Sequence, residues 1–374
     1  MATVTKTIGT SSRDYSTIVA WEADLSDASI YSNNDDAVGV MYADSTFTDA
    51  TVTIDGGTSI GGSSGQDLDS ITLTVVAADR HDGTAESGAL LKPTGASGHT
   101  NGIIRIEQDN ITIEWLDMSL DSLDSTNTNR AIVIASNGDN TIIRNMLIHD
   151  KGGNPGSDAV GGITSSFGGA ADDNRSIFNN IIYSLIETDT DSSSAINMRA
   201  FEGNLYIYNN TIYLLKSNGP SKDAVGMRFG NTGTTVAYVK NNIVAGLDGA
   251  DKNYAYWQDD NASTLNSANN LSDDTTDAVA DAEDFAQSAN DSSALTGKTL
   301  AQIDFVSTTV GAEDLHISQS SVCIGAGVDL GTTNGVEIDI NGRDRDATGD
   351  TWDIGAHEFT VAARHASAFV MFVD

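Results

Sequence analysis

Two arginines and a tryptophan are the residues of the repeated segments best suited to grip a ligand. Arg199, Arg228 and Trp257 each follow a short alternating apolar strand, so we predict that they share one outward-facing row. Guanidinium groups beside an indole ring can hold a sugar or a carboxylate. The alternative, which we favour, is that each guanidinium pairs with an acidic turn residue such as Asp223.

Residues placed for bond cleavage are not evident in the sequence. Glycoside hydrolysis needs two carboxylates across the scissile bond, and a lyase needs a base and usually a cation. Asp172 and Asp173 fall in a turn beside glycine and alanine, and His149 and His316 stand alone in the sequence. We therefore predict no catalytic residue.

An oxygen-rich turn, DINGRDRD, offers Asp339, Asn341, Asp344 and Asp346 as candidate ligands for Ca²⁺. The segment lacks the spacing of an EF-hand and carries two arginines. We therefore favour, over a metal site, a turn rich in Asp and Asn that Arg343 and Arg345 stabilise. The stretch 253–297 contains nine acidic residues and no Lys or Arg, which suggests a solvated excursion from the helix or, alternatively, a Ca²⁺-binding loop. We expect no other cofactor.

These side chains need a repeated element to position them, and the dipeptide Asn-Asn returns at regular intervals. It occurs at residues 179–180, 209–210, 241–242 and 269–270, spaced by 30, 32 and 28 residues. The first three copies lie in the apolar runs SIFNNIIYSL, YIYNNTIYLL and YVKNNIVAGL, and a second short strand precedes each of them. Such a period indicates a solenoid, a propeller or an array. Gly, Asp and Ser clusters between the strands indicate turns rather than crossover helices.

An all-β parallel β-helix satisfies this pattern, because each coil can bury its inward row against the next coil. An asparagine repeated at the bend between strands adopts a left-handed backbone conformation at low cost, and its amide can bond to the amides above and below. We predict such a ladder from five residues: Asn145, Asn180, Asn210, Asn242 and Asn270.

The chain resembles the right-handed parallel β-helix proteins of the pectate-lyase-like superfold over about residues 100 to 360. The run DFVSTTVGAEDLHISQSSVCIGAG, then DINGRDRD and DIGAHEF, looks like the end of many bacterial and phage β-helix repeat proteins. The resemblance implies the architecture but not the chemistry, since the superfold hosts lyases, hydrolases, adhesins and virion parts. Neither the motif set of polygalacturonase-like hydrolases nor that of pectate lyases is found.

Four regions follow from these features. Residues 1–100 are expected to form an N-terminal cap and the first coils, with one amphipathic helix from Asp14 to Leu25. Residues 101–272 form the central coils with the ladder, 273–360 an acidic excursion and closing coils, and 361–374 an apolar tail. The tail residues are expected either to pack on the terminal coil or to dock onto a partner or a second copy: Phe369, Val370, Met371, Phe372 and Val373.

Charge restricts the classes of partner. The sequence contains 19 Lys and Arg residues and 53 Asp and Glu residues, which gives a net charge of −34. Such a surface repels nucleic acid and anionic membranes. The single cysteine, Cys323, is expected to be a buried apolar residue. The N-terminal residues contain no apolar stretch typical of a signal peptide, which predicts synthesis in a host cytoplasm.

The sequence thus favours a non-enzymatic structural protein of a bacteriophage virion, either a capsid decoration or a tail or fibre component. Its expected partners are other virion proteins or copies of itself. Two alternatives stay open: a tailspike-like polysaccharide depolymerase, and a carbohydrate-binding adhesin that contacts a surface glycan.

Overall fold

The structure is a computed structural model. It describes residues 2–49, 51–55, 67–94, 102–121, 129–135, 138–150, 160–165, 173–187, 192–199, 201–218, 222–230, 235–258, 264–274, 293–348 and 351–360. The predicted docking tail, Asp172 and most of the acidic excursion lie outside these residues.

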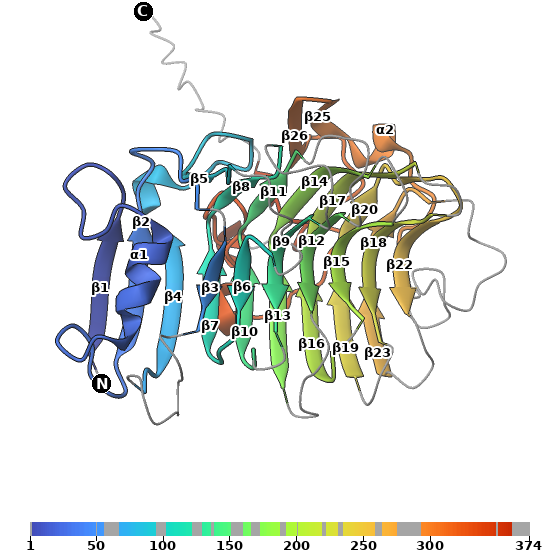
Figure 1. The fold of residues 1–374 in the computed structure, drawn as a ribbon. Coiled ribbons are helices and arrows are strands. Elements are labelled where there is room, and N and C mark those ends of the chain that lie inside the picture. The colour runs from blue at the N-terminus through green and yellow to red at the C-terminus, as the bar shows by residue number, and fades with distance from the viewer. Residues whose placement is uncertain are drawn as a thin grey trace, which may run out of the picture.

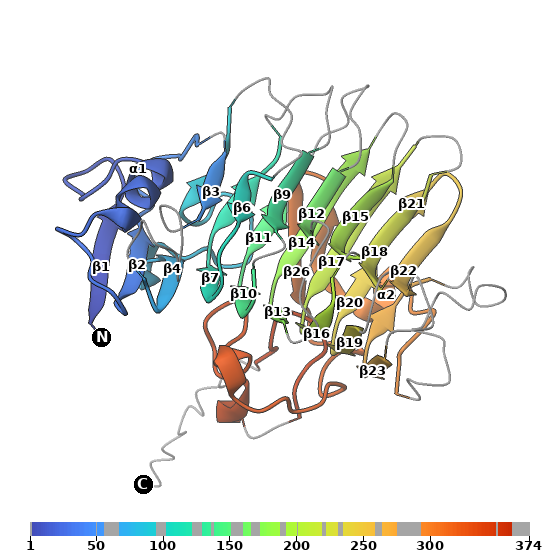
Figure 2. The same cartoon turned by 60° about the horizontal axis from the view of Figure 1, so that its bottom comes forward.

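The strands form three parallel sheets that extend along a β-helix (Figures 1 and 2). Sheet A contains β1 (Thr3–Ile8), β2 (Asp36–Met41), β4 (Ser70–Val75), β7 (Ile111–Glu114), β10 (Thr141–Arg144), β13 (Asn174–Phe178), β16 (Gly203–Tyr208), β19 (Thr235–Lys240) and β23 (Thr264–Ala268). Sheet B contains β5 (Leu90–Leu91), β8 (Asp117–Ser119), β11 (Leu147–His149), β14 (Ile181–Glu187), β17 (Thr211–Ser217), β20 (Ile243–Ala245) and β24 (Leu271–Ser272), with β21 (Asp248–Gly249) beside β17. Sheet C contains β3 (Val52–Ile54), β6 (Ile104–Ile106), β9 (Asn129–Ile134), β12 (Val160–Ser165), β15 (Ser193–Met198), β18 (Ala224–Phe229) and β22 (Asn253–Gln258).

Each central coil visits sheets A, B and C in turn, and equivalent residues of successive coils stack inside. In sheet C, Ile132, Ile163, Ile196, Met227 and Tyr256 pair in register, and all five side chains are fully buried. This buried row forms because side chains alternate in direction along a strand, so that every second residue points to the same face. The predicted all-β parallel β-helix is confirmed.

A short helix covers the N-terminal end. Helix α1 (Ile18–Ala23) is followed by a 3₁₀ turn (Asp24–Ser26), and it begins later than the predicted Asp14 because the hydroxyl of Thr17 caps it by accepting from Ala20 N. Trp21 is fully buried against Gly39, where even a Cβ atom would lie 2.7 Å from the indole ring. The helix packs beside β1 and β3 and thus covers the first coil.

The second asparagine of each dipeptide forms a ladder inside the coils. The amide nitrogens of Asn180, Asn210 and Asn242 each donate to the side-chain oxygen of the next rung, at 2.9, 3.0 and 2.9 Å, and the last rung is Asn270. All four side chains are fully buried. Asn145 does not belong to this ladder, because Met146 N, not Asn145, contacts Asn180 Oδ1. Asn145 aligns instead with the first asparagine of the next dipeptide.

That first asparagine occupies a left-handed turn and faces outward from the coil. The φ angles are 52° at Asn145, 56° at Asn179, 52° at Asn209, 57° at Asn241 and 55° at Asn269. We call these five residues the turn column. Residues other than glycine, asparagine and aspartate adopt this conformation at a higher cost.

The C-terminal region does not form the closing coils that we expected. It contains α2 (Leu300–Ile303), the antiparallel pair β25 (Phe305–Thr309) and β26 (Ala312–Ile317), and 3₁₀ turns at Thr333–Gly335 and Arg345–Thr348. Phe305, Leu315 and Ile340 pack on the outward side chains Ile181 and Ile243 of sheet B. The chain therefore folds back along the coils, as the orange and red segment in Figure 2 shows.

The turn column bonds to this returning chain, the closing segment, which comprises residues 322–348 and 351–360. Asn269 Nδ2 donates to Ala326 O at 2.8 Å, and Asn241 both donates to Val328 O at 2.8 Å and accepts from Val328 N at 2.9 Å. Further along, Asn179 Nδ2 donates to Val336 O and Ile338 O, and Asn145 Nδ2 donates to Asp339 O, at 3.0, 2.6 and 2.7 Å. The closing segment thus runs antiparallel to the order of the coils.

The DIGAHEF motif has a defined role in this docking. Gly355 has a φ of 100° and leaves no room for a Cβ atom, which would lie 2.6 Å from Ile243 Cδ1. Asp353 accepts from the backbone amides of Gly325 and Phe359. Glu358 forms a buried ion pair of 2.9 Å with Arg345. Burial raises the pKa of Glu358 to about 7, although Arg345 opposes this change.

The ladder predicts a stability change. Asn210→Ala removes the bonds that Asn210 Nδ2 donates to Asn242 and to Ile177 O. It also removes the oxygen that accepts from the backbone and side-chain amides of Asn180. We expect a loss of about 1–3 kcal/mol in the free energy of unfolding, measured by denaturant titration. The control is Asn204→Ala, which removes one bond between half-buried amides. Its loss in the free energy of unfolding should be much smaller than that of Asn210→Ala. Equal effects of the two substitutions would contradict the ladder's contribution.

Candidate ligand-binding groove

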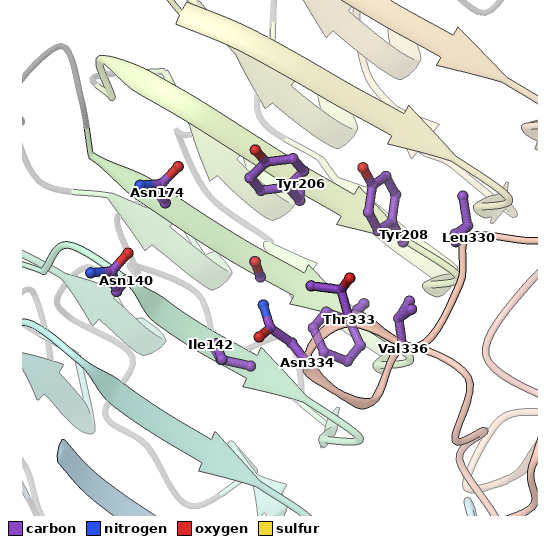
Figure 3. A pocket seen from close by; sticks show the side chains of 11 residues that line it. Asn140, Ile142, Asn174, Tyr206, Tyr208, Leu330, Thr333, Asn334 and Val336 are labelled. Atoms are coloured by element: carbon purple, nitrogen blue, oxygen red, sulfur yellow. The ribbon is translucent and has the colours of Figure 1, made fainter.

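A groove of about 610 Å³ lies between the outward face of sheet A and the closing segment (Figure 3). Ile142, Ser176 and Tyr206 are register partners on β10, β13 and β16, so their side chains follow one another along the groove. Phe178 and Tyr208 form a second such row. Alternation within each strand puts both rows on the outward face.

The opposite wall comes from a part of the chain that is distant in sequence. Leu330, Thr333, Asn334 and Val336 of the closing segment form this wall, and Leu330 and Val336 pack in one cluster with Tyr208. Arg144 holds this wall by donating to Asn334 O while it pairs with Glu114 at 2.6 Å. The groove therefore exists because the closing segment is bonded to the coils.

Amide side chains line the edge of the groove where the strands of sheet A begin. Asn140 and Asn174 belong to a column in which Asn140 Nδ2 donates to Asn110 Oδ1 at 3.1 Å and Asn204 Nδ2 donates to Asn174 Oδ1 at 3.2 Å. An amide carries both a donor and an acceptor, which suits it to a hydroxyl group. This edge can bond to a polyhydroxylated ligand.

The aromatic side chains remain neutral and offer both a ring and a hydroxyl. Tyr206 stacks on Tyr238 with 5.0 Å between ring centroids and lies 6.1 Å from the ring of Tyr208. Burial raises the pKa of Tyr206 and of Tyr208, so both hydroxyls keep their protons in neutral solution. The described residues that line the groove include no Asp, Glu, Lys, Arg or His. The described lining of the groove is thus uncharged, which fits an uncharged ligand.

The predicted arginine and tryptophan row is only partly assembled. Arg228 and Trp257 are register partners on β18 and β22, and the guanidinium carbon lies 3.7 Å from the ring centroid. Their partner on β15 is Asn197, so the prediction for Arg199 is wrong by two residues, and Arg199 lies exposed beyond the end of that strand. Burial and the charge of Asp251 raise the pKa of Asp223, and Lys252 and Arg228 only partly oppose this rise.

The candidate metal turn uses its carboxylates for backbone bonds. Asp339 accepts from the amides of Asn341, Arg343 and Glu358, at 2.9, 2.8 and 3.0 Å. Asp344 accepts from Asp346 N, and Asp346 accepts from the indole of Trp352. Among the described residues, no group of three or more His, Cys, Asp or Glu side chains is placed to hold a metal ion. Cys323 is buried, which raises the pKa of its thiol to about 12.

His149 and His316, which stand alone in the sequence, both contact carboxylates. His149 Nε2 lies 2.7 Å from Asp117 Oδ1, its Nδ1 lies 2.7 Å from Asp150 Oδ2, and its ring stacks on Tyr183. Burial would lower the pKa of His149, but the two aspartates raise it to about 9. The sequence could not reveal the contact with Asp117, because it joins successive coils.

The sequence-based prediction also missed the aromatic groove, although the positions of its tyrosines in the sequence could have indicated it. Tyr206 and Tyr208 stand at alternating positions directly before an Asn-Asn pair, and Asn174 begins the equivalent strand one coil earlier. Outward aromatics at equivalent positions of a predicted solenoid indicate a binding face. The wall from the closing segment has no comparable signal in the sequence.

No family model matches this chain, and no similar sequence is found among curated proteins. The functional proposal therefore rests on the geometry of the groove. No helix in the described part of the chain is both long and apolar enough to cross a membrane.

The buried His149 cluster predicts a dependence of stability on pH. A folded pKa of about 9 against 6.5 unfolded means that the stabilisation is complete below pH 6.5 and is lost as the pH rises through 9. A tenfold difference in proton affinity between the two states corresponds to about 1.4 kcal/mol. We expect the melting temperature to fall between pH 7 and 9.5, and the slope to flatten in His149→Gln. An identical slope in this variant would contradict the charged state assigned to His149.

Proposed function

We propose that this protein is a non-enzymatic β-helical binding protein whose groove on sheet A takes a neutral glycan. The observation that carries the proposal is the lining: two outward tyrosines and a column of amides, without a charged side chain among the described lining residues. Binding sites for small molecules typically combine aromatic surface with a few placed polar groups.

The two kinds of side chain have separate roles in binding. The faces of Tyr206 and Tyr208 stack against the apolar C–H face of a sugar ring, and their hydroxyls remain available as donors. Asn140, Asn174 and Asn334 bond to the sugar hydroxyls and orient the ring. Because β10, β13 and β16 pair in register, the amides of Asn140 and Asn174 lie at equivalent positions of successive coils, which suits a polymer of repeated units.

Cleavage of the glycan is not part of this proposal. Hydrolysis requires a pair of carboxylates at the bond that is cut, and elimination requires a base. The described lining of the groove supplies neither. This favours a binding role, as in an adhesin or a receptor-binding particle component, over the tailspike-like depolymerase.

The setting that we propose is a bacteriophage particle, in which the protein decorates the capsid or forms part of a tail or fibre. Its support is the resemblance of the closing segment to phage and bacterial β-helix proteins, together with a strongly acidic body that avoids nucleic acid. A glycan-binding groove suits a component that meets a cell surface.

The groove predicts a specific loss of binding on removal of its tyrosines. A screen of neutral oligosaccharides should yield a ligand, and Tyr208→Ala or Tyr206→Ala should weaken its affinity about tenfold, the effect expected for one lost stacking contact. Titration calorimetry measures the affinity. The control is Tyr42→Ala, which removes an outward ring that packs under Arg13 near the N-terminal end.

Two outcomes would overturn this function. One is a ligand whose affinity is the same in wild type, Tyr206→Ala and Tyr208→Ala, because it would then bind elsewhere. The other is the release of new reducing ends or unsaturated products from the bound glycan, which would make the protein a depolymerase.

The proposed setting has its own test. Mass spectrometry of purified phage particles that carry this gene should detect the protein at a fixed ratio to the major capsid or tail proteins. Its presence in the lysate together with its absence from washed particles would refute a virion role and leave the glycan-binding proposal standing.

A further inference from the structure

A second cavity, of about 730 Å³, lies between the loop that follows β4 and the C-terminal region. The loop contributes Arg80, His81 and Asp82, and the C-terminal region contributes His316, Arg343 and His357. Trp115, which precedes β8, forms part of the wall. The cavity gathers cationic and imidazole groups in a protein with a net charge of −34.

Two arginines of this cavity form no ion pair with any described carboxylate. Arg80 lies over the ring of Trp115 at 4.3 Å, and its Nε donates to Val75 O at 3.4 Å. Arg343 is exposed and its guanidinium donates to Glu358 O and to the hydroxyl of Thr360, at 3.4 and 3.2 Å. Several other arginines do pair, including Arg13–Asp44, Arg105–Glu107, Arg144–Glu114 and Arg345–Glu358. Acidic residues outnumber basic ones nearly threefold, and Glu114 acts on Arg80 only at a longer range than an ion pair. Two guanidinium groups without an ion pair at one cavity therefore indicate an anionic ligand.

The acidic side chains of the cavity are already engaged. Asp314 bonds to Nδ1 and to the backbone amide of His316. Asp82 accepts from the amide and the hydroxyl of Thr84. Neither carboxylate forms a described ion pair with Arg80 or Arg343, so both guanidinium groups keep N–H donors for a ligand.

The imidazole groups reinforce this character. Burial would lower the pKa of His316, but Asp314 and Asn341 raise it, which favours the protonated ring. His357 Nδ1 accepts from Ile317 N at 3.2 Å, so its hydrogen resides on Nε2 and that atom is a donor. Burial, His316 and Arg343 lower the pKa of His357 to about 3, so this ring stays neutral and adds a donor without a charge.

We propose that this cavity, which both Arg80 and Arg343 line, binds a small oxyanion, such as a phosphate, a sulfate or a carboxylate group. A planar guanidinium presents paired N–H donors that match the oxygens of such a group. The site is separate from the glycan groove, since the two share no lining residue.

The test is titration calorimetry of the full-length protein with inorganic phosphate at constant ionic strength. Parallel titrations with sulfate and with glucuronate distinguish a free inorganic anion from an acidic group on a sugar. We expect saturable binding of at least one of the three. Arg343→Gln should weaken it about tenfold, as expected for a lost charge-assisted bond. Arg13→Gln, which removes an arginine paired with Asp44, should leave the affinity unchanged.

Arg343 is exposed, so Arg343→Gln should melt as the wild type does, and a changed affinity then reports the site and not the fold. Arg80→Gln provides the second variant, with a melt as its folding check because Arg80 packs on Trp115. The proposal fails if none of the three anions binds saturably. It also fails if Arg343→Gln and Arg80→Gln bind as tightly as Arg13→Gln.

Discussion

The hydrogen bonds of the turn column hold the closing segment against the coils of the β-helix. At each of five successive coils an asparagine adopts a left-handed backbone conformation, and at least four of these side chains reach a backbone group of the closing segment within 3.0 Å. A single net bond of this kind contributes about 0.5–1.5 kcal/mol, so the column acts through repetition. The Asn-Asn dipeptide therefore has two functions: its first residue turns the chain and binds the closing segment, and its second residue builds the internal ladder.

Both cavities depend on this arrangement. The groove on sheet A needs Leu330, Thr333 and Val336 as one wall, and the second cavity needs Asn341 and Arg343. These residues flank the carbonyls that the turn column binds. The outward face of a β-helix is flat where nothing covers it, so the returning chain is what makes it concave. The two terminal regions thus have different structural roles: α1 covers the first coil, whereas the closing segment forms cavities with the outer surface of the coils.

Local and periodic features of the fold could be predicted, and distant contacts could not. Alternation and the Asn-Asn period specified the parallel β-helix and four rungs of its ladder. The alignment of Asn145 was wrong by one position because a methionine follows it where the other copies have a second asparagine. The row of Arg199 was wrong by two because loop lengths differ between coils. The path of the closing segment rests on contacts such as Asn145 with Asp339, 194 residues apart, for which neither pattern nor composition gives a signal.

Hydrogen–deuterium exchange of Asn241→Gly is the most direct test of the turn column. Glycine keeps the left-handed turn but removes both side-chain bonds to Val328. The account predicts that amides around residues 325–340 exchange at least about tenfold faster, while those of β16, β17 and β19 stay protected. Asn140→Gly is the matched control, because Asn140 also has a positive φ but bonds to Asn110 instead. Unchanged protection of the closing segment in Asn241→Gly, or an equal loss throughout the coils, would contradict the role assigned to the turn column.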